Sequence, residues 1–127
     1  MELYKLQVEE GRIFLHEHPA NATSWQMEEV VHVAGLNGVQ VVVVDQCMYG
    51  LRVRSSKGHT MPARKATKFM TNSWHLAEEL KKRCDGTHEH QALVNDRARD
   101  AQVYPQELCK AICRGLIKQK TDDGKRK

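Results

Sequence analysis

The sequence predicts an α/β domain built on a partial, mostly parallel sheet with flanking helices. Residues 12–16 and 39–44 have the composition of strands, and the amphipathic segment 25–34 between them has helical spacing. A strand–helix–strand order makes the two strands parallel neighbours, because the connection crosses over one face of the sheet. The second strand is almost entirely valine, which is typical of a sheet covered on both faces.

Local signals predict the remaining elements. Thr23 and Gln26 fit a capping box at the start of the helix over 25–34, and Asn72 or Ser73 caps a later helix. The further elements are a helix over 2–10, a strand over 68–71, a helix over 74–83 and a last helix that starts at Pro105. We expect one domain over residues 1–117 and a disordered basic tail over 118–127.

The composition predicts an intracellular protein of the cytoplasm or nucleus. The chain has 127 residues, of which 40% are hydrophobic, and it contains no apolar run of the roughly 18 residues that would predict a membrane helix. The N-terminus lacks the basic and apolar regions of a signal peptide. Four cysteines are too few for a disulfide scaffold of this length, so we expect free thiols in a reducing compartment.

The charge is distributed unevenly along the chain. Residues 1–51 carry two basic and seven acidic side chains, whereas residues 118–127 carry five basic and two acidic ones. Residues 52–68 carry no acid, and their basic side chains are Arg52, Arg54, Lys57, Arg64, Lys65 and Lys68. Such a basic segment predicts contact with a polyanion, either DNA or RNA. A solvated loop and a frayed tail are the alternative.

Polar side chains follow both predicted strands. Carboxyl ends of parallel strands meet at one edge of a sheet, where α/β proteins place their sites. The candidates for a degenerate catalytic site there are Glu17, His18, Asp45 and Cys47. Glu17 is preferred because a carboxyl group at a strand end can protonate, or hydrogen-bond, a bound base; a turn-capping role is the alternative. We expect His16 and His18 to face one ion only if the chain bends at Pro19.

The later cysteines and histidines suggest zinc as a second interpretation. Thiolates and imidazoles are the ligands that zinc prefers, and the candidates are Cys84, His88, His90, Cys109 and Cys113. Cys109 and Cys113 are one helical turn apart and share a face. The spacing matches no common zinc pattern, so buried thiols and a polar loop are the alternative. The zinc deaminase class is excluded, because the chain has no Cys-x-x-Cys.

An ordered series of motifs resembles one domain of Copia-type retroelement polyproteins of algae, other protists and fungi. The resemblance covers about residues 2–117, and its motifs are His16-Glu-His-Pro19, Ser24-Trp25, Asp45-Gln-Cys-Met-Tyr-Gly-Leu51, Lys65-Ala-Thr-Lys-Phe-Met-Thr-Asn-Ser73, His88-Glu-His-Gln91 and Tyr104-Pro105. Relatives have Lys-Pro-Thr where this chain has Ala66 after the lysine. The resemblance implies a fragment of a retrotransposon polyprotein.

That domain in turn resembles the later half of a DNA cytosine-C5 methyltransferase, which implies a truncated Rossmann-like, methyltransferase-like fold. By position, Glu17 matches the glutamate that contacts the base, His18 replaces an asparagine, and Tyr49-Gly50 matches a Tyr-Gly motif. The cofactor loop and the Pro-Cys nucleophile are missing, so S-adenosylmethionine is implied only for a chain that contains the missing N-terminal half.

These observations favour a non-catalytic fragment that contacts nucleic acid through its basic segment. The alternative is a small metal-binding or hydrolytic or transferase domain with a site around Glu17, Asp45 and Cys47. A plain interaction domain needs no site at all. A truncated sheet leaves an exposed strand edge, so we also expect self-association through that edge.

Overall fold

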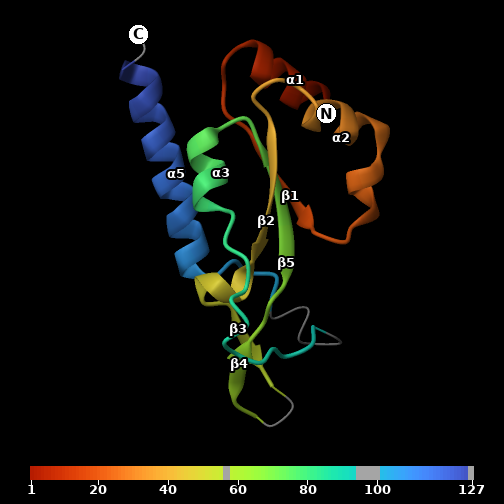
Figure 1. Ribbon diagram of the computed structural model, residues 1–127, viewed down its shortest axis with the longest axis vertical. Helices are drawn as coiled ribbons and strands as arrows, with labels where there is room; N and C mark the ends of the chain where they lie inside the picture. The colour runs from red at the N-terminus through yellow and green to blue at the C-terminus, as the bar shows by residue number, and fades with distance from the viewer. Residues whose placement is uncertain (56–57, 94–100, 126–127) are drawn as a thin grey trace.

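The computed structural model describes residues 1–55, 58–93 and 101–125. A three-stranded sheet has the order β1-β5-β2, and β3 pairs with β4 in a separate hairpin (Figure 1). The strands are β1 (Leu15–Pro19), β2 (Gln40–Asp45), β3 (Arg52–Arg54), β4 (Thr60–Pro62) and β5 (Ala66–Thr71). The helices are α1 (Glu2–Glu9), α2 (Glu28–Ala34), α3 (Trp74–Glu79) and α5 (Gln106–Lys125), with the short 3-10 turns η1 (Thr23–Gln26) and η2 (Gln46–Tyr49).

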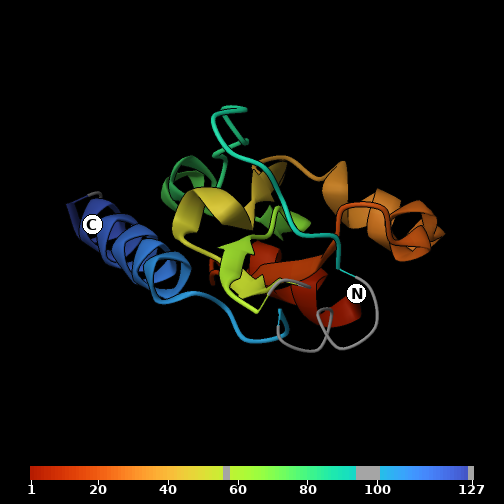
Figure 2. The same cartoon turned by 90° about the horizontal axis from the view of Figure 1, so that it is seen from below.

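Helices cover both faces of the three-stranded sheet. α3 and α5 lie on one face, and α1 and α2 lie on the other, as Figures 1 and 2 show from two directions. Neighbouring residues of β5 point to opposite faces. Phe69 therefore packs with Leu76 and Leu108 beneath α3 and α5, whereas Met70 packs with Val30 and Val33 beneath α2. The central strand thus contributes to both apolar clusters.

The sheet is antiparallel, so the predicted mostly parallel, Rossmann-like or methyltransferase-like sheet is wrong. β5 lies between β1 and β2 and is antiparallel to both. The two outer strands share one direction, and their carboxyl ends reach the same edge, where Pro19 pairs with Thr67 and Asp45 pairs with Ala66. The expectation of a shared edge is therefore correct. Contrary to the prediction, β1 and β2 are not neighbours, because the β3–β4 hairpin turns the chain back and β5 then lies between the two strands.

The predicted helix over 25–34 is divided. Met27 adopts an extended conformation and forms the N-cap of α2, so η1 and α2 are separate elements. The capping box of Thr23 and Gln26 is not formed, since η1 has no side-chain cap hydrogen bond among the described residues. Trp25 instead donates its indole N–H to the Pro19 carbonyl at 3.0 Å. That bond holds the segment against the end of β1.

Two further boundaries differ from expectation. The first strand begins at Leu15 rather than at residue 12, because Asn72 binds the backbone of Arg12 and Phe14 through its side chain. The tail expected to be disordered continues as helix, since α5 extends to Lys125. Within the described residues, no helix is long and apolar enough to cross a membrane.

Ser73, one of the two expected capping residues, is the N-cap of α3. Its hydroxyl oxygen accepts the Leu76 backbone N–H at 3.1 Å and donates to the Gln119 side-chain carbonyl at 2.8 Å. We expect Ser73→Ala to lower the free energy of unfolding by about 1 kcal/mol, the usual value of such a cap. Urea denaturation measures the change. Ser24→Ala is the matched control, because the Ser24 hydroxyl has no hydrogen-bond partner among the described residues; an equal loss in both variants would contradict the capping role.

Candidate metal centre

Two thiols and two imidazoles converge beyond the carboxyl end of β2. Cys47 belongs to η2, and Cys84, His88 and His90 belong to the loop that follows α3. The ligating atoms of these four side chains all lie within 4.8 Å of one another. In the described part of the chain no other group of three or more such side chains is as close. We call these four residues the Cys2His2 group.

Two sulfur–nitrogen distances in the Cys2His2 group suit a tetrahedral ion. The Cys84 sulfur lies 3.5 Å from Nε2 of His88 and 3.5 Å from Nε2 of His90. Zinc binds sulfur at about 2.3 Å and imidazole nitrogen at about 2.0–2.1 Å, so a tetrahedral site separates its sulfur and nitrogen ligands by about 3.5 Å. The sulfur–nitrogen edges that the structure shows therefore have the length that zinc requires.

Backbone geometry places Cys47 at this end of the sheet. The backbone N–H of Gln46 donates to the Arg64 carbonyl at 2.6 Å, and the Gln46 side chain donates to the Thr67 hydroxyl at 3.0 Å. Gly50 ends η2 in the left-handed region with φ 87°, which glycine adopts without a steric penalty. These contacts fix η2 to the start of β5 and direct Cys47 toward the loop 84–90.

Asp45 positions the other side of the group. Its carboxylate is fully buried and accepts the Cys84 backbone N–H at 2.7 Å. It also accepts Nε of Arg64 at 3.0 Å and Nε of Arg83 at 2.9 Å. Burial favours a higher pKa for Asp45, but these hydrogen bonds outweigh it and hold the pKa below its usual value. Asp45 thus holds Cys84 as a positioning residue rather than as a ligand.

Burial shifts the pKa values of two residues of the Cys2His2 group, Cys47 and His90. Burial raises the pKa of the Cys47 thiol to about 12, and the neighbouring Cys84 contributes to the increase. A coordinated cation reverses this preference, because zinc binds the thiolate. Burial also lowers the pKa of His90, as does the charge of His88. A lowered pKa favours the neutral imidazole, which is the form that binds a metal.

The structure brings together only part of the zinc set expected from sequence. Cys84, His88 and His90 belong to the Cys2His2 group, whereas Cys109 and Cys113 are exposed on α5 and lie outside it. Cys47 takes their place, although the sequence suggested it as a member of the candidate catalytic set. The relevant signal was a cysteine directly after a strand together with the Cys-x-x-x-His-x-His run, but the pairing requires knowledge that these two segments are neighbours.

The proposed catalytic set does not form one site. Glu17 and His18 are consecutive on β1 and therefore face opposite sides of the sheet. The expected bend at Pro19 is unnecessary, because His16 and His18 share one face, with ring centroids 4.8 Å apart. Burial raises the pKa of the Tyr104 hydroxyl, as does its hydrogen bond with Glu17 on the other face. Asp45 and Cys47 have the roles described above.

Several residues of the predicted basic segment have structural partners. Arg52 donates to the Thr60 side chain and carbonyl, and the Lys68 ammonium lies 5.7 Å from the Trp25 ring centroid. Lys65 has a positive φ of 38° and donates to the Ala101 carbonyl, so it supports the turn before β5. Arg54 is exposed on β3, Arg64 binds Asp45, and Lys57 lies outside the described residues.

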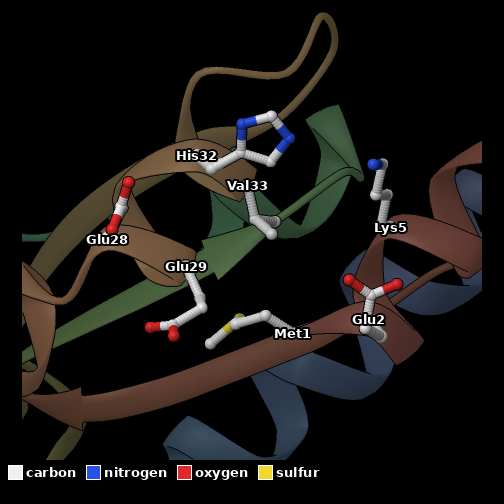
Figure 3. A pocket seen from close by; sticks show the side chains of 7 residues that line it. All are labelled: Met1, Glu2, Lys5, Glu28, Glu29, His32 and Val33. Atoms are coloured by element: carbon white, nitrogen blue, oxygen red, sulfur yellow. The ribbon is translucent and has the colours of Figure 1, made fainter.

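A pocket of about 370 Å³ lies between α1 and α2, far from the Cys2His2 group along the sheet (Figures 1 and 3). Its lining combines both signs of charge and includes Glu2, Lys5, Glu28, Glu29 and His32. Figure 3 shows these side chains spread around the rim rather than directed at one point. The pocket therefore offers no convergent set of catalytic groups.

Comparison with known proteins adds no family assignment. No family model, no curated protein and no solved structure matches the chain. The resemblance to retroelement polyproteins stays a prediction from the motifs. The functional conclusion must therefore come from the geometry of the chain itself, and the Cys2His2 group is the one cluster of potential metal ligands found among the described residues.

Proposed function

We propose that this chain is a non-catalytic domain stabilised by a structural zinc ion. The observation that carries the proposal is the convergence of the Cys2His2 group, with its ligating atoms within 4.8 Å of one another. Two thiolates and two imidazoles favour zinc over hard cations such as magnesium and calcium. The ion would be held by Cys47, Cys84, His88 and His90.

A site with four protein ligands favours a structural role. Catalytic zinc keeps one position for water or substrate, whereas structural zinc is bound by four side chains. The ion would tie η2 to the loop 84–90, and that loop reaches the hairpin, since the Gln91 N–H donates to the Pro62 carbonyl at 2.9 Å. The metal would therefore connect the sheet to the β3–β4 hairpin and leave no coordination position for hydrolysis or group transfer.

The motif series supports the further proposal that this zinc domain is part of a retroelement polyprotein. Three of the four ligands lie inside its motifs: Cys47 in the Asp45–Leu51 motif, and His88 and His90 in the His88–Gln91 motif. A set of ligands spread over separate motifs is what a shared metal site requires. We include this setting, the intracellular location and self-association through a strand edge in the proposal as predictions.

Metal analysis of the full chain tests the zinc proposal. We expect one zinc per chain after purification without chelator, measured by mass spectrometry of the metal against protein concentration. Cys47→Ser should abolish stoichiometric zinc, because a hydroxyl is a poor replacement for thiolate. Cys109→Ser is the matched control, since Cys109 is exposed on α5 outside the group, and it should retain the metal.

Cobalt provides an independent readout of the ligand set. Replacement of zinc by Co²⁺ should give the visible absorption of a tetrahedral thiolate site in the wild-type chain and in Cys109→Ser, but not in Cys47→Ser. A chain that is folded and free of zinc, or a Cys47→Ser variant that keeps one zinc per chain, would remove the proposal.

A further inference from the structure

Two arginines share one buried carboxylate beside the Cys2His2 group. Arg64 follows β4, and Arg83 directly precedes the ligand Cys84. Each binds a different oxygen of Asp45 through Nε, at 3.0 Å and 2.9 Å respectively. Segments from two different parts of the chain therefore bring two guanidinium groups to the same point at the edge of the sheet.

The outer nitrogens of both guanidinium groups are available for a ligand. The side chains of Arg64 and Arg83 are 51% and 52% exposed, whereas Asp45 is completely buried beneath them. Each arginine hydrogen-bonds Asp45 through Nε, and within residues 1–55, 58–93 and 101–125 no hydrogen bond of the terminal nitrogens is found. The contact with Asp45 reduces the conformational freedom that each arginine would lose on binding a ligand.

The local charge favours an anion. Two arginines and one carboxylate sum to one positive charge, and zinc with two thiolates and two neutral imidazoles is neutral. In the adjoining segment 81–90 the exposed acids Asp85 and Glu89 are balanced by the exposed Lys81 and Lys82. The adjacent hairpin adds Arg52 and Arg54, both exposed on β3. The basic C-terminal half of α5 lies at the opposite end of the molecule (Figure 1). The positive surface expected from sequence is therefore divided, and the arginine pair lies in its hairpin half.

We infer that Arg64 and Arg83 form a binding site for the phosphodiester backbone of a nucleic acid. The fork of a guanidinium group matches two phosphate oxygens, and two neighbouring forks suit neighbouring phosphates of one strand. The inference rests on the proposed zinc function, because the metal holds Cys84 and thereby the adjacent Arg83. In this site Asp45 positions the two arginines. Arg83 is a new member of the nucleic-acid surface, because it lies outside the basic segment 52–68.

Fluorescence anisotropy of the zinc-loaded full chain tests the inference. The labelled probes are a single-stranded RNA and a DNA duplex of equal length, each titrated at several salt concentrations. Asp45→Asn/Arg64→Gln/Arg83→Gln removes the pair without leaving a buried charge unpaired. We expect it to weaken binding by about tenfold or more and to reduce the salt slope by about two, one for each phosphate contact. The two probes show whether RNA or DNA is the better source of the phosphates.

Two further variants make the result specific. Lys120→Gln on α5 changes the net charge by the same single unit and should leave binding within about twofold of wild type. Arg64→Lys/Arg83→Lys keeps all the charge and its partner Asp45 but lacks the outer fork, and should weaken binding as the triple variant does. Retained binding in the lysine variant, or equal loss in Lys120→Gln, would overturn the arginine pair in favour of a diffuse basic surface.

The zinc content of every sample separates the two proposals. If the zinc-loaded arginine variants bind as tightly as wild type, the proposed arginine site is contradicted and the proposed zinc domain is unaffected. A wild-type chain without zinc removes the metal centre, and arginine-dependent binding by that chain would support the pair alone. No binding of either probe by the zinc-loaded wild type overturns the inference.

Discussion

Removal of zinc with a strong chelator is expected to lower the unfolding temperature of the wild-type chain sharply. The ligands join residues that are distant in sequence, Cys47 on one side and the loop from Cys84 to His90 on the other. Structural zinc in isolated fingers contributes an apparent binding free energy of about 10–16 kcal/mol. The total stability of a domain is only about 5–15 kcal/mol, so the loss of several kcal/mol would leave this domain marginal.

The effect should be concentrated around the β3–β4 hairpin. The hairpin packs through a small cluster of Leu51, Val53, Ala63 and Ala101, which is separate from the two main clusters. A cluster of this size buries little apolar surface, so we expect the proposed zinc ion to supply part of its stability. Hydrogen exchange should therefore show the largest loss of protection in residues 46–54 and 60–64 after chelation.

Calorimetry with and without chelator measures the global effect. Cys47→Ser is the control for non-specific action, because a variant without metal should show no further change when chelator is added. Readdition of zinc should restore the wild-type transition, whereas magnesium should not. An unchanged transition in the chelated wild-type chain, with zinc confirmed absent, would contradict a structural role for the metal.

Gly115→Val is expected to lower the free energy of unfolding by about 3 kcal/mol, because it overfills a tight helix crossing. Gly115 lies in α5 where this helix crosses α3. A Cβ atom at residue 115 would lie 2.8 Å from Cδ2 and 2.9 Å from Cα of Leu76, and 3.3 Å from the His75 carbonyl oxygen. The second and third contacts are to backbone, so rotation of a side chain cannot relieve them and α5 must move away from α3.

Movement of α5 would disturb the cluster beneath it. Leu108 and Ala111 of α5 are completely buried against Leu76 and Leu80. Gly124→Val is the matched control, because it lies in the same helix and a Cβ there meets no atom within 4 Å. Its effect should stay within about 0.5 kcal/mol, since valine and glycine differ little in helix propensity. Urea denaturation of both variants decides, and equal effects would contradict a close approach at Gly115.

Local patterns predicted the helices and the strands of the three-stranded sheet, but not the β3–β4 hairpin, which lies in the segment expected to be a basic loop. The valine-rich run became β2, the spacing of apolar residues gave α1, and the capping signal at Asn72 or Ser73 correctly placed the start of α3. These features depend on neighbouring residues, so they are visible in the sequence. The division of the helix over 25–34 was missed, because Met27 is extended although methionine is a good helix former.

The direction and order of strands required the tertiary structure. A helix between two strands usually indicates a parallel pair, but here β5 pairs with both and separates them. The choice depends on Phe69 and Met70, which supply apolar side chains to both faces of the central strand. Such long-range burial cannot be read from the order of elements, and the expected methyltransferase-like sheet failed for that reason.

The sequence alone determined the chemical types at the site and most of its local structure: thiols, imidazoles and a strand that ends in Asp45. Only the tertiary structure decided which of them meet. Cys47 joins the loop 84–90 because Asp45 binds the Cys84 N–H and η2 is fixed to β5. The exposed Cys109 and Cys113 are excluded because α5 presents them to solvent. A metal site needs its ligands within a few ångströms, and that distance is set by packing between segments remote in the chain.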